Sequence, residues 1–566
     1  MKELSNNLNI SDIKMQMCDD NQERHNLDSP NKIIRWINYK FQEQIKKHKK
    51  QRENGLPLYR CIDLSNCIIS TSYNNGEPSL TNLCDIIYEN ENVKLLDCFI
   101  NNGYGNKYYH EVLEKFVCKN SLIYAAFFHM TKFHKDVDFE GTKFKGHASF
   151  GRCLFQNGAW FQKAKFSGNF AFDGCTFEGS TYFPNAEFDV RQINFTDSIF
   201  RGVFIARNLT IIDDQTNDNH AFKSYITFAG AEFHKEFDFS NNNIARDISF
   251  GGTKFYEKCS FEKCNFRNNA IFDETEINGN LLFTLILDDN ERKEINWNTI
   301  NNISFNRASI FGRIDFENCR IAKLNMNFTV IKAGGIFRIY ESHVTYLDFT
   351  SLNNNGVLML EDNQNNLEEI TLKSAINTGV IEIERTVIQK INDRISARLL
   401  KDSALKNGNT IDALEYRKAE MKLYKNDENL QEKRGSTFLL WLNEKSNEHG
   451  TNWIRGVKFT FICWIGFYLL FLIISRIDDI IAFQTHRDIA WTFLKDVSNG
   501  VGYLWSLDFL GTLSIWINKF VFSGVWWMII LKIIQLALGT IVYCLGKIAI
   551  AYGIYQTIVA FRKYGK

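Results

Sequence analysis

The sequence has few of the features that would place it in a common class. Its charges nearly cancel, with a net charge of +1 over 566 residues, which excludes a disordered polyelectrolyte and a strongly basic nucleic-acid binder. There is no Walker loop, dinucleotide-binding fingerprint or HExxH motif, and the 11 histidines are scattered. We therefore expect no enzyme, no catalytic residues, no cofactor and no metal site.

Cysteine usage and the first residues bear on the cellular compartment. The first thirty residues contain no apolar segment that could serve as a signal peptide, and the chain is far larger than a small disulfide-rich domain. The 13 cysteines are therefore expected as free thiols in a reducing cytosol.

Phenylalanine is the abundant residue, with 48 copies against only 4 prolines. From Phe128 to Phe188 the spacing alternates between five and six residues, and the ladder resumes at Phe228. This spacing fits neither the helical period nor the strand period, so it indicates a repeat. The core ladder is predicted at Phe133, Phe144, Phe155, Phe166, Phe177, Phe188, Phe233, Phe255 and Phe266. A small inward-facing residue is predicted two residues before phenylalanines of this ladder, at Cys153, Ala164, Cys175, Ala186, Ala231 and Cys264.

A square coil explains this alternation. Each unit of five or six residues would form one short face, so that four faces make a coil of about 22 residues, and coils would stack about 4.8 Å apart. Phe155 would then lie on Phe177, and Cys153 on Cys175. We interpret the cysteines as compact apolar filler rather than metal ligands.

The units CTFEG, AEFDV, TKFKG and CNFRN resemble the pentapeptide-repeat proteins. This resemblance implies a mainly β fold, a right-handed quadrilateral β-helix (solenoid). The chain departs from the usual unit by preferring Phe to Leu and by lengthening every second unit by one residue. We assign residues 60–390 to this domain, and we expect insertions at 70–93, 101–120, 201–227 and 284–300, which are either recognition loops or tolerated surface excursions.

The segments flanking the repeats differ from them in character. Residues 1–59 are polar and are expected to be partly disordered, with a basic helix that ends in KKHKKQR. Residues 391–455 carry helical patterns and are predicted to form a hairpin that closes the open end of the solenoid, with Asn409 or Thr410 as a helix cap.

Residues 456–566 are predicted to form a transmembrane domain. It contains a span at 459–475, a loop at 477–520 and an apolar tract at 521–561. The tract is longer than one ordinary span, so it holds either an interfacial stretch followed by one span, which we favour, or two spans turning near Gly539 or Gly546. Basic residues outside both ends place the repeat domain in the cytosol, at a bacterial inner membrane.

One short motif in the loop is similar to a potassium-channel filter. Val501, Gly502 and Tyr503 match the filter, but the following Leu504 stands where the filter needs glycine. We therefore favour a re-entrant or surface segment, and we keep these three residues and Lys532 as candidate pore-lining positions.

Two function classes follow from this organisation. The first is a membrane-anchored interaction scaffold or sensor that binds an unidentified cytosolic protein. The second is a membrane-permeabilising or channel-like effector, with a role in anti-phage or stress defence, whose spans assemble into a homo-oligomer. The family resemblance adds a third, a DNA mimic that binds topoisomerase, but the balanced charge of the repeats argues against it. A nucleic-acid partner is not expected.

Overall fold

The computed structural model describes residues 15–17, 23–28, 32–33, 35–40, 42–44, 61–69, 99–101, 110–123, 126–146, 148–168, 170–212, 225–284, 298–363, 367–425, 434–475 and 526–562. The chain divides into two units, 1–392 and 393–566. Each unit is described by itself.

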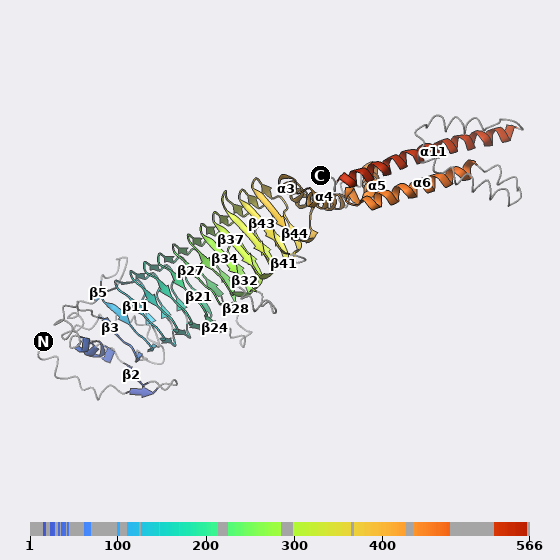
Figure 1. The fold of residues 1–566 in the computed structure, drawn as a ribbon. Coiled ribbons are helices and arrows are strands. Elements are labelled where there is room, and N and C mark those ends of the chain that lie inside the picture. Colours follow the sequence, from blue (N-terminus) through green and yellow to red (C-terminus); the bar gives the residue numbers. More distant parts are fainter. Residues whose placement is uncertain are drawn as a thin grey trace, which may run out of the picture. The chain divides into compact units, whose positions relative to one another are not determined.

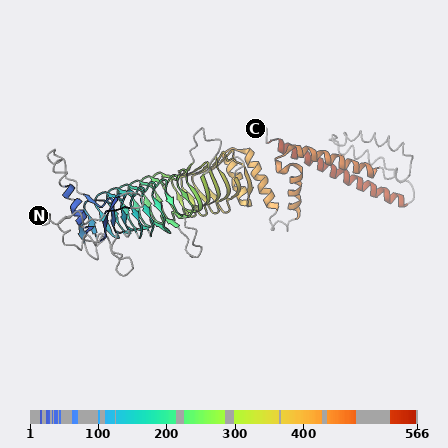
Figure 2. The same cartoon turned by 90° about the horizontal axis from the view of Figure 1, so that it is seen from below.

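The first unit is a parallel β-solenoid, as predicted (Figures 1 and 2). One coil contributes β14 (Leu154–Phe155), β15 (Ala159–Trp160), β16 (Lys165–Phe166) and β17 (Phe170–Ala171). We call the sheets that contain these strands sheets 1, 2, 3 and 4. Within the described residues, sheets 1, 2 and 4 have 13 strands each and sheet 3 has 8.

Phenylalanine rings fill the interior of the solenoid. All nine predicted ladder residues are buried. The next strand of sheet 1, β18 (Thr176–Phe177), pairs with β14 so that Phe177 lies beside Phe155. Their ring centroids are 4.6 Å apart and the ring planes differ by 1°. Strand pairing at this spacing therefore sets the distance between stacked rings.

The small residues also lie in the interior. All six predicted positions are buried. The thiols of Cys175 and Cys264 donate hydrogen bonds to the carbonyl oxygens of Phe150 at 2.8 Å and Phe239 at 3.0 Å. Burial raises the pKa of Cys264 to about 12, so this thiol stays protonated.

The solenoid changes its cross-section along its length. Sheet 3 ends at β24 (Thr210–Ile211), and the next strand at that face, β28 (Asn243–Ile244), pairs with β32 (Asn265–Ile271) of sheet 4. In β32, Phe266 and Ala270 both point inward, and the register shifts between them. Two faces are thus joined into one strand, whereas we expected four separate faces throughout.

Asparagine side chains explain why the chain runs straight through this corner. Asn269 Nδ2 donates to Asp247 Oδ1 at 3.0 Å, and Asn302 Nδ2 donates to Asn269 Oδ1 at 3.1 Å. Asn302 lies in β35 (Asn298–Ser304), the strand that pairs with β32. These side chains continue the hydrogen bonding between coils at the corner itself.

The solenoid also begins earlier than the repeat pattern indicates. Strand β2 (Glu23–Leu27), in the segment expected to be polar and partly disordered, pairs with β4 (Cys67–Ile69). Strands β6 (His110–Val112) and β7 (Lys115–Val117), within the expected insertion 101–120, extend sheets 1 and 2. Valine and isoleucine replace phenylalanine at several of these inward positions, which is why the ladder was not visible there.

The other expected insertions are shorter in the structure. Strands β23 (Phe204–Ile205) and β25 (Tyr225–Thr227) belong to the solenoid although they fall within 201–227. The remaining parts of two expected insertions lie outside the described residues, at 213–224 and 285–297. The expected insertion at 70–93 also lies outside them.

The second unit is helical. Its described elements are α3 (Arg394–Lys406), α4 (Thr410–Lys425), α5 (Arg434–Asn447), the 3-10 turn η4 (Glu448–Gly450), α6 (Trp453–Ser475) and α11 (Trp526–Phe561). Asn409 caps α4, because its Oδ1 accepts a hydrogen bond from the backbone N–H of Asp412 at 3.1 Å. We predicted that these helices close the open end of the solenoid, and for α3 and α4 this stays a prediction.

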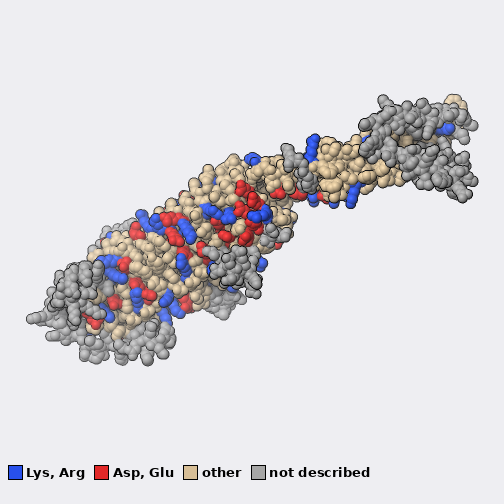
Figure 3. All heavy atoms as spheres, in the orientation of Figure 1, with Lys and Arg blue, Asp and Glu red and all other residues tan. Residues whose placement is uncertain are grey.

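Two helices of this unit are long and apolar enough to cross a membrane. The candidate spans are Trp453–Ile474, with 22 residues, and Ile529–Phe561, with 33. Helix α11 continues through Gly539 and Gly546 without a turn, and the number of spans in the tract stays a prediction. The helices α6 and α11 pack side by side (Figure 1), and charged side chains are sparse on them compared with the solenoid (Figure 3).

Candidate functional site at the helical junction

Buried polar side chains gather where α6 begins and α11 ends. Asn447, the last residue of α5, caps the turn η4, because its Oδ1 accepts from the backbone N–H of Gly450 at 2.9 Å. Its Nδ2 donates to the carbonyl oxygen of Gln556 in α11 at 3.0 Å and also to the side-chain oxygen of Gln556. Asn447 and Gln556 are only 1% and 8% exposed. Helix α5 is therefore joined to α11 through amides that water does not reach.

A second contact lies one turn earlier on α5. The side-chain oxygen of Asn443 accepts hydrogen bonds from the hydroxyl of Tyr552 and from Nε2 of Gln556, the latter at 3.0 Å. Gln556 thus uses both ends of its amide, and truncating its side chain would remove one donor to Asn443 and one acceptor of Asn447. The bond from Tyr552 to Asn443 and the bond from Asn447 to the backbone carbonyl of residue 556 would stay. Networks of this kind favour one arrangement of the helices that carry them.

Glu448 connects α4 to α6 through two ion pairs. Its carboxylate lies 2.5 Å from the guanidinium of Arg455 in α6 and 3.1 Å from the ammonium of Lys418 in α4. Burial alone would raise the pKa of Glu448, but the hydrogen bond from Lys418 and the charges of Lys418 and Arg455 lower it. Glu448 therefore stays ionised at neutral pH.

A similar carboxylate holds α3 on α4. Glu420 is 3% exposed and accepts from Arg398 at 2.9 Å and Lys401 at 2.8 Å. Burial opposes the charged form, yet the hydrogen bonds from the two basic groups lower the pKa of Glu420. Together with Glu448 and Asn447, Glu420 completes a series of polar contacts from α3 through α4 and η4 to both apolar helices.

The two apolar helices approach each other closely beside this junction. Gly456 faces Thr557, and Gly553 faces Thr460. A Cβ atom added at Gly553 would lie 2.4 Å from the hydroxyl of Thr460, so only glycine fits there. At the far end of α6, Gln535 donates to the carbonyl oxygen of Ile474 at 2.7 Å. Small residues and buried amides are the usual means of pairing helices in lipid.

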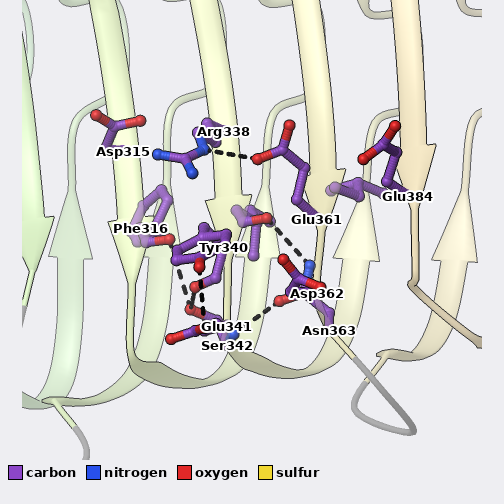
Figure 4. Close-up of polar contacts among 12 residues, drawn as sticks. Asp315, Phe316, Arg338, Tyr340, Glu341, Ser342, Glu361, Asp362, Asn363 and Glu384 are labelled. Carbon is purple, nitrogen blue, oxygen red and sulfur yellow. Dashed lines mark hydrogen bonds and ion pairs between the residues drawn. The ribbon is translucent and has the colours of Figure 1, made fainter.

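The outer face of sheet 2 carries a different kind of polar cluster. It spans β37 (Arg313–Glu317), β40 (Ile336–Tyr340), β43 (Val357–Glu361) and β46 (Val380–Glu384), shown in Figure 4. Arg338 pairs with Glu361 at 3.0 Å and lies 4.4 Å from the ring centroid of Tyr340. Next to the strands, Asn363 accepts from the backbone N–H of Ser342 at 2.7 Å. The four strands contain five acidic residues, Asp315, Glu317, Glu361, Glu382 and Glu384, and two basic ones, Arg313 and Arg338, so this part of the surface is acidic (Figure 3).

The residues singled out from the sequence lie apart from the junction. The ladder and small-slot residues form the solenoid core, and Lys532 lies near the beginning of α11. Val501, Gly502 and Tyr503 lie outside the described residues. Within the described part of the chain, no group of three or more His, Cys, Asp or Glu could hold a metal ion.

The junction residues Asn443, Asn447, Glu448 and Gln556 were missed. One signal was present, because Gln556 is an amide within an apolar tract, where an unpaired polar group would be costly.

Comparison with known families agrees with the repeat pattern. Residues 122–165 match the family model of pentapeptide repeats. No curated protein and no solved structure matches the chain. The molecule is thus a parallel β-solenoid that contains pentapeptide repeats, followed by helices, two of which could anchor it in a membrane.

Proposed function

We propose that this protein is a membrane-anchored interaction scaffold and sensor. The solenoid binds a cytosolic protein, and the helical junction passes the effect of binding to α6 and α11. Pentapeptide-repeat solenoids typically act as non-enzymatic scaffolds, which supports this class. The observation that carries the proposal is the continuous series of polar contacts from α3 to α11, in which Glu420, Asn447 and Gln556 are buried and the ion pairs of Glu448 are partly buried. Helices that merely tethered a solenoid would not need such a series.

The proposed location is a bacterial inner membrane with the solenoid in the cytosol. The rings of Trp453 and Phe561 lie 4.7 Å apart, so the start of α6 and the end of α11 are at the same end of the helix pair. Arg455 and Lys458 near that end, and Arg562 after α11, favour the cytosolic side by the positive-inside rule.

Thiol labelling of intact cells tests this topology. A cysteine at the exposed Ser374 should be protected from an impermeant thiol reagent, and one at Ser498 should react, with the unsubstituted chain as the background. Labelling at Ser374 from outside would contradict the cytosolic location.

Hydrogen exchange in nanodiscs tests the relay. A photo-crosslinker on the outer face of sheet 2 identifies the partner in cells, and the purified partner is then added to the full chain. We expect exchange to change in residues 443–460 and 550–562 of the unsubstituted chain. In the Gln556→Ala variant we expect the partner to bind but these segments to show no response. Absence of any specific crosslink would refute the scaffold, and an unchanged junction would refute the relay.

A channel-like effector is the second candidate, and two lysines favour it. Lys532 and Lys547 lie within the apolar helix α11, where charged side chains usually mark ion pathways or partner contacts. If oligomerised helices conduct ions, expression of the full chain should depolarise the membrane, and Lys547→Leu should abolish this without releasing the protein. An unaltered membrane potential would exclude this function.

A further inference from the structure

The outer face of sheet 1 changes in chemistry towards its C-terminal end. This part consists of β36 (Ser309–Ile310), β39 (Val330–Ile331), β42 (Asn353–Asn354) and β45 (Ile376–Asn377). The strand register aligns Ser309, Val330, Asn353 and Ile376 in one outward column. We call this surface, with the corner residues on both sides, the C-terminal face of sheet 1.

One corner of this face holds an exposed phenylalanine. Phe328 precedes β39, is 61% exposed and has a positive φ of 59°. Left-handed backbone conformations are unusual for bulky residues, and the next two coils carry Ser351 and Ser374 at the same corner. A serine would therefore satisfy the fold, and the aromatic ring needs another explanation.

The opposite corner holds a second aromatic residue. Phe311 follows β36 and is 44% exposed. The ammonium of Lys332 lies 5.7 Å from its ring centroid. Ile376 in the outward column is 61% exposed. Three large apolar side chains thus face solvent on the same part of one sheet.

The charges on this face are of one sign. The outward and corner positions from Ser309 to Thr378 include Lys332, and Lys373 lies next to a corner, but none of these positions is Asp or Glu. The N-terminal part of the same sheet is different, because there Glu232 pairs with Lys254 at 2.8 Å. The carboxylates in the outward column of this sheet, those of Glu111, Glu232 and Glu276, thus lie N-terminal to the part that exposes the apolar side chains.

We propose that the C-terminal face of sheet 1 binds the surface of an anionic lipid bilayer. Aromatic and aliphatic side chains that enter the headgroup region, together with lysines and no carboxylates, are the chemistry of interfacial binding. The inference rests on the membrane anchoring proposed above, which brings a bilayer within reach of the solenoid. An acidic protein partner would also suit the positive charge, and the experiment separates the two.

A fluorescent label on the full chain in liposomes tests this contact. Phe328→Cys is labelled with a polarity-sensitive dye, and Met359→Cys, on the outer face of sheet 2, is the matched control. The unsubstituted chain, labelled in parallel, gives the background. In phosphatidylcholine–phosphatidylglycerol liposomes we expect a blue shift and quenching by chain-brominated lipid at position 328 but not at 359. The effect should weaken in pure phosphatidylcholine.

The possible failures of this test are distinguishable. A chain that does not float with the liposomes would refute the anchoring itself. A chain that floats while its label at 328 stays in water would refute only the lipid contact, as would a label that shifts only when a soluble acidic protein is added.

Substitutions taken from neighbouring coils identify the responsible residues. Phe328→Ser and Phe311→Asn introduce residues that other coils carry at the same corners, so the fold should be kept. With the label at Ile376→Cys, the double variant should lose most of the blue shift. Tyr256→Asn, at the corner position of Phe311 but in the N-terminal part of the sheet, should leave the shift unchanged. Equal losses in both variants would overturn the proposal.

Discussion

Truncation of one ladder residue should open a cavity that the solenoid cannot close. Phe166 is 1% exposed, and its ring lies between those of Phe144 at 4.9 Å and Phe188 at 5.1 Å. The backbone N–H of Ser167 donates to the carbonyl oxygen of Phe144 at 2.8 Å, and the backbone N–H of Asp189 donates to the carbonyl oxygen of Phe166 at 2.7 Å. These bonds hold the coils on both sides of Phe166 in place. Because these bonds prevent the coils from moving together, Phe166→Ala should cost about 3–5 kcal/mol of stability. The lost ring contacts favour the upper half of that range.

An exposed phenylalanine of the same solenoid is the matched control. Phe328→Ala removes the same atoms from a side chain that is 61% exposed, so it should cost less than about 1 kcal/mol. Urea denaturation monitored by circular dichroism measures the loss of stability. Because a solenoid need not unfold in one step, hydrogen exchange of individual coils is measured as well. Amides in the coils that contain residues 144, 166 and 188 should lose protection first. Equal losses for both variants would refute the assigned packing.

Three further predictions follow from the described contacts. Cys153→Ala should cost at most about 1 kcal/mol in urea denaturation, because alanine fills the equivalent slot in other coils; a larger loss, or metal in the purified protein, would contradict the filler role. The pKa of Glu420 is lower in the folded state than in the unfolded state. The ionised carboxylate therefore stabilises the fold fully above its unfolded-state pKa of about 4.3, and this stabilisation is lost as the pH falls through its lower folded-state pKa. Exchange from α3 and α4 should therefore increase in acid, and Glu420→Gln should remove this dependence; if the dependence persists, another group causes it. Gly553→Val should separate α6 from α11 at Thr460, seen as loss of a disulfide crosslink engineered between the helices. Gly466→Val should keep the crosslink, because a Cβ atom added at Gly466 meets no atom of another helix within 4 Å.

The solenoid was predictable because its constraint is local and repeated. Each rung needs one large residue, and the next rung follows after a fixed number of residues, so the pattern is visible without knowledge of contacts. The two apolar helices were predictable from length and composition for the same reason. Both predictions are confirmed.

The change in cross-section gave no such signal. Residues 267–269 read Arg-Asn-Asn, and polar residues of this kind suit a corner as well as the exposed side of a continuing strand. The side chains of Phe266 and Ala270 point inward in either arrangement. Only the side-chain hydrogen bonds between coils, through Asp247 and Asn302, decide that the strand continues.

The junction depends on pairs that no local pattern reveals. Asn447 and Gln556 are 109 residues apart and were assigned to different segments, a polar helical linker and an apolar tract. From the sequence, Asn447 would be expected as a solvated residue at the end of a helix in the linker. Gln556 would be expected as a single polar residue in an otherwise apolar tract. Each of these buried amides satisfies part of the hydrogen-bonding capacity of the other. Loss of Gln556 should therefore affect α5 as much as α11, which would not be expected if the amide faced solvent or lipid.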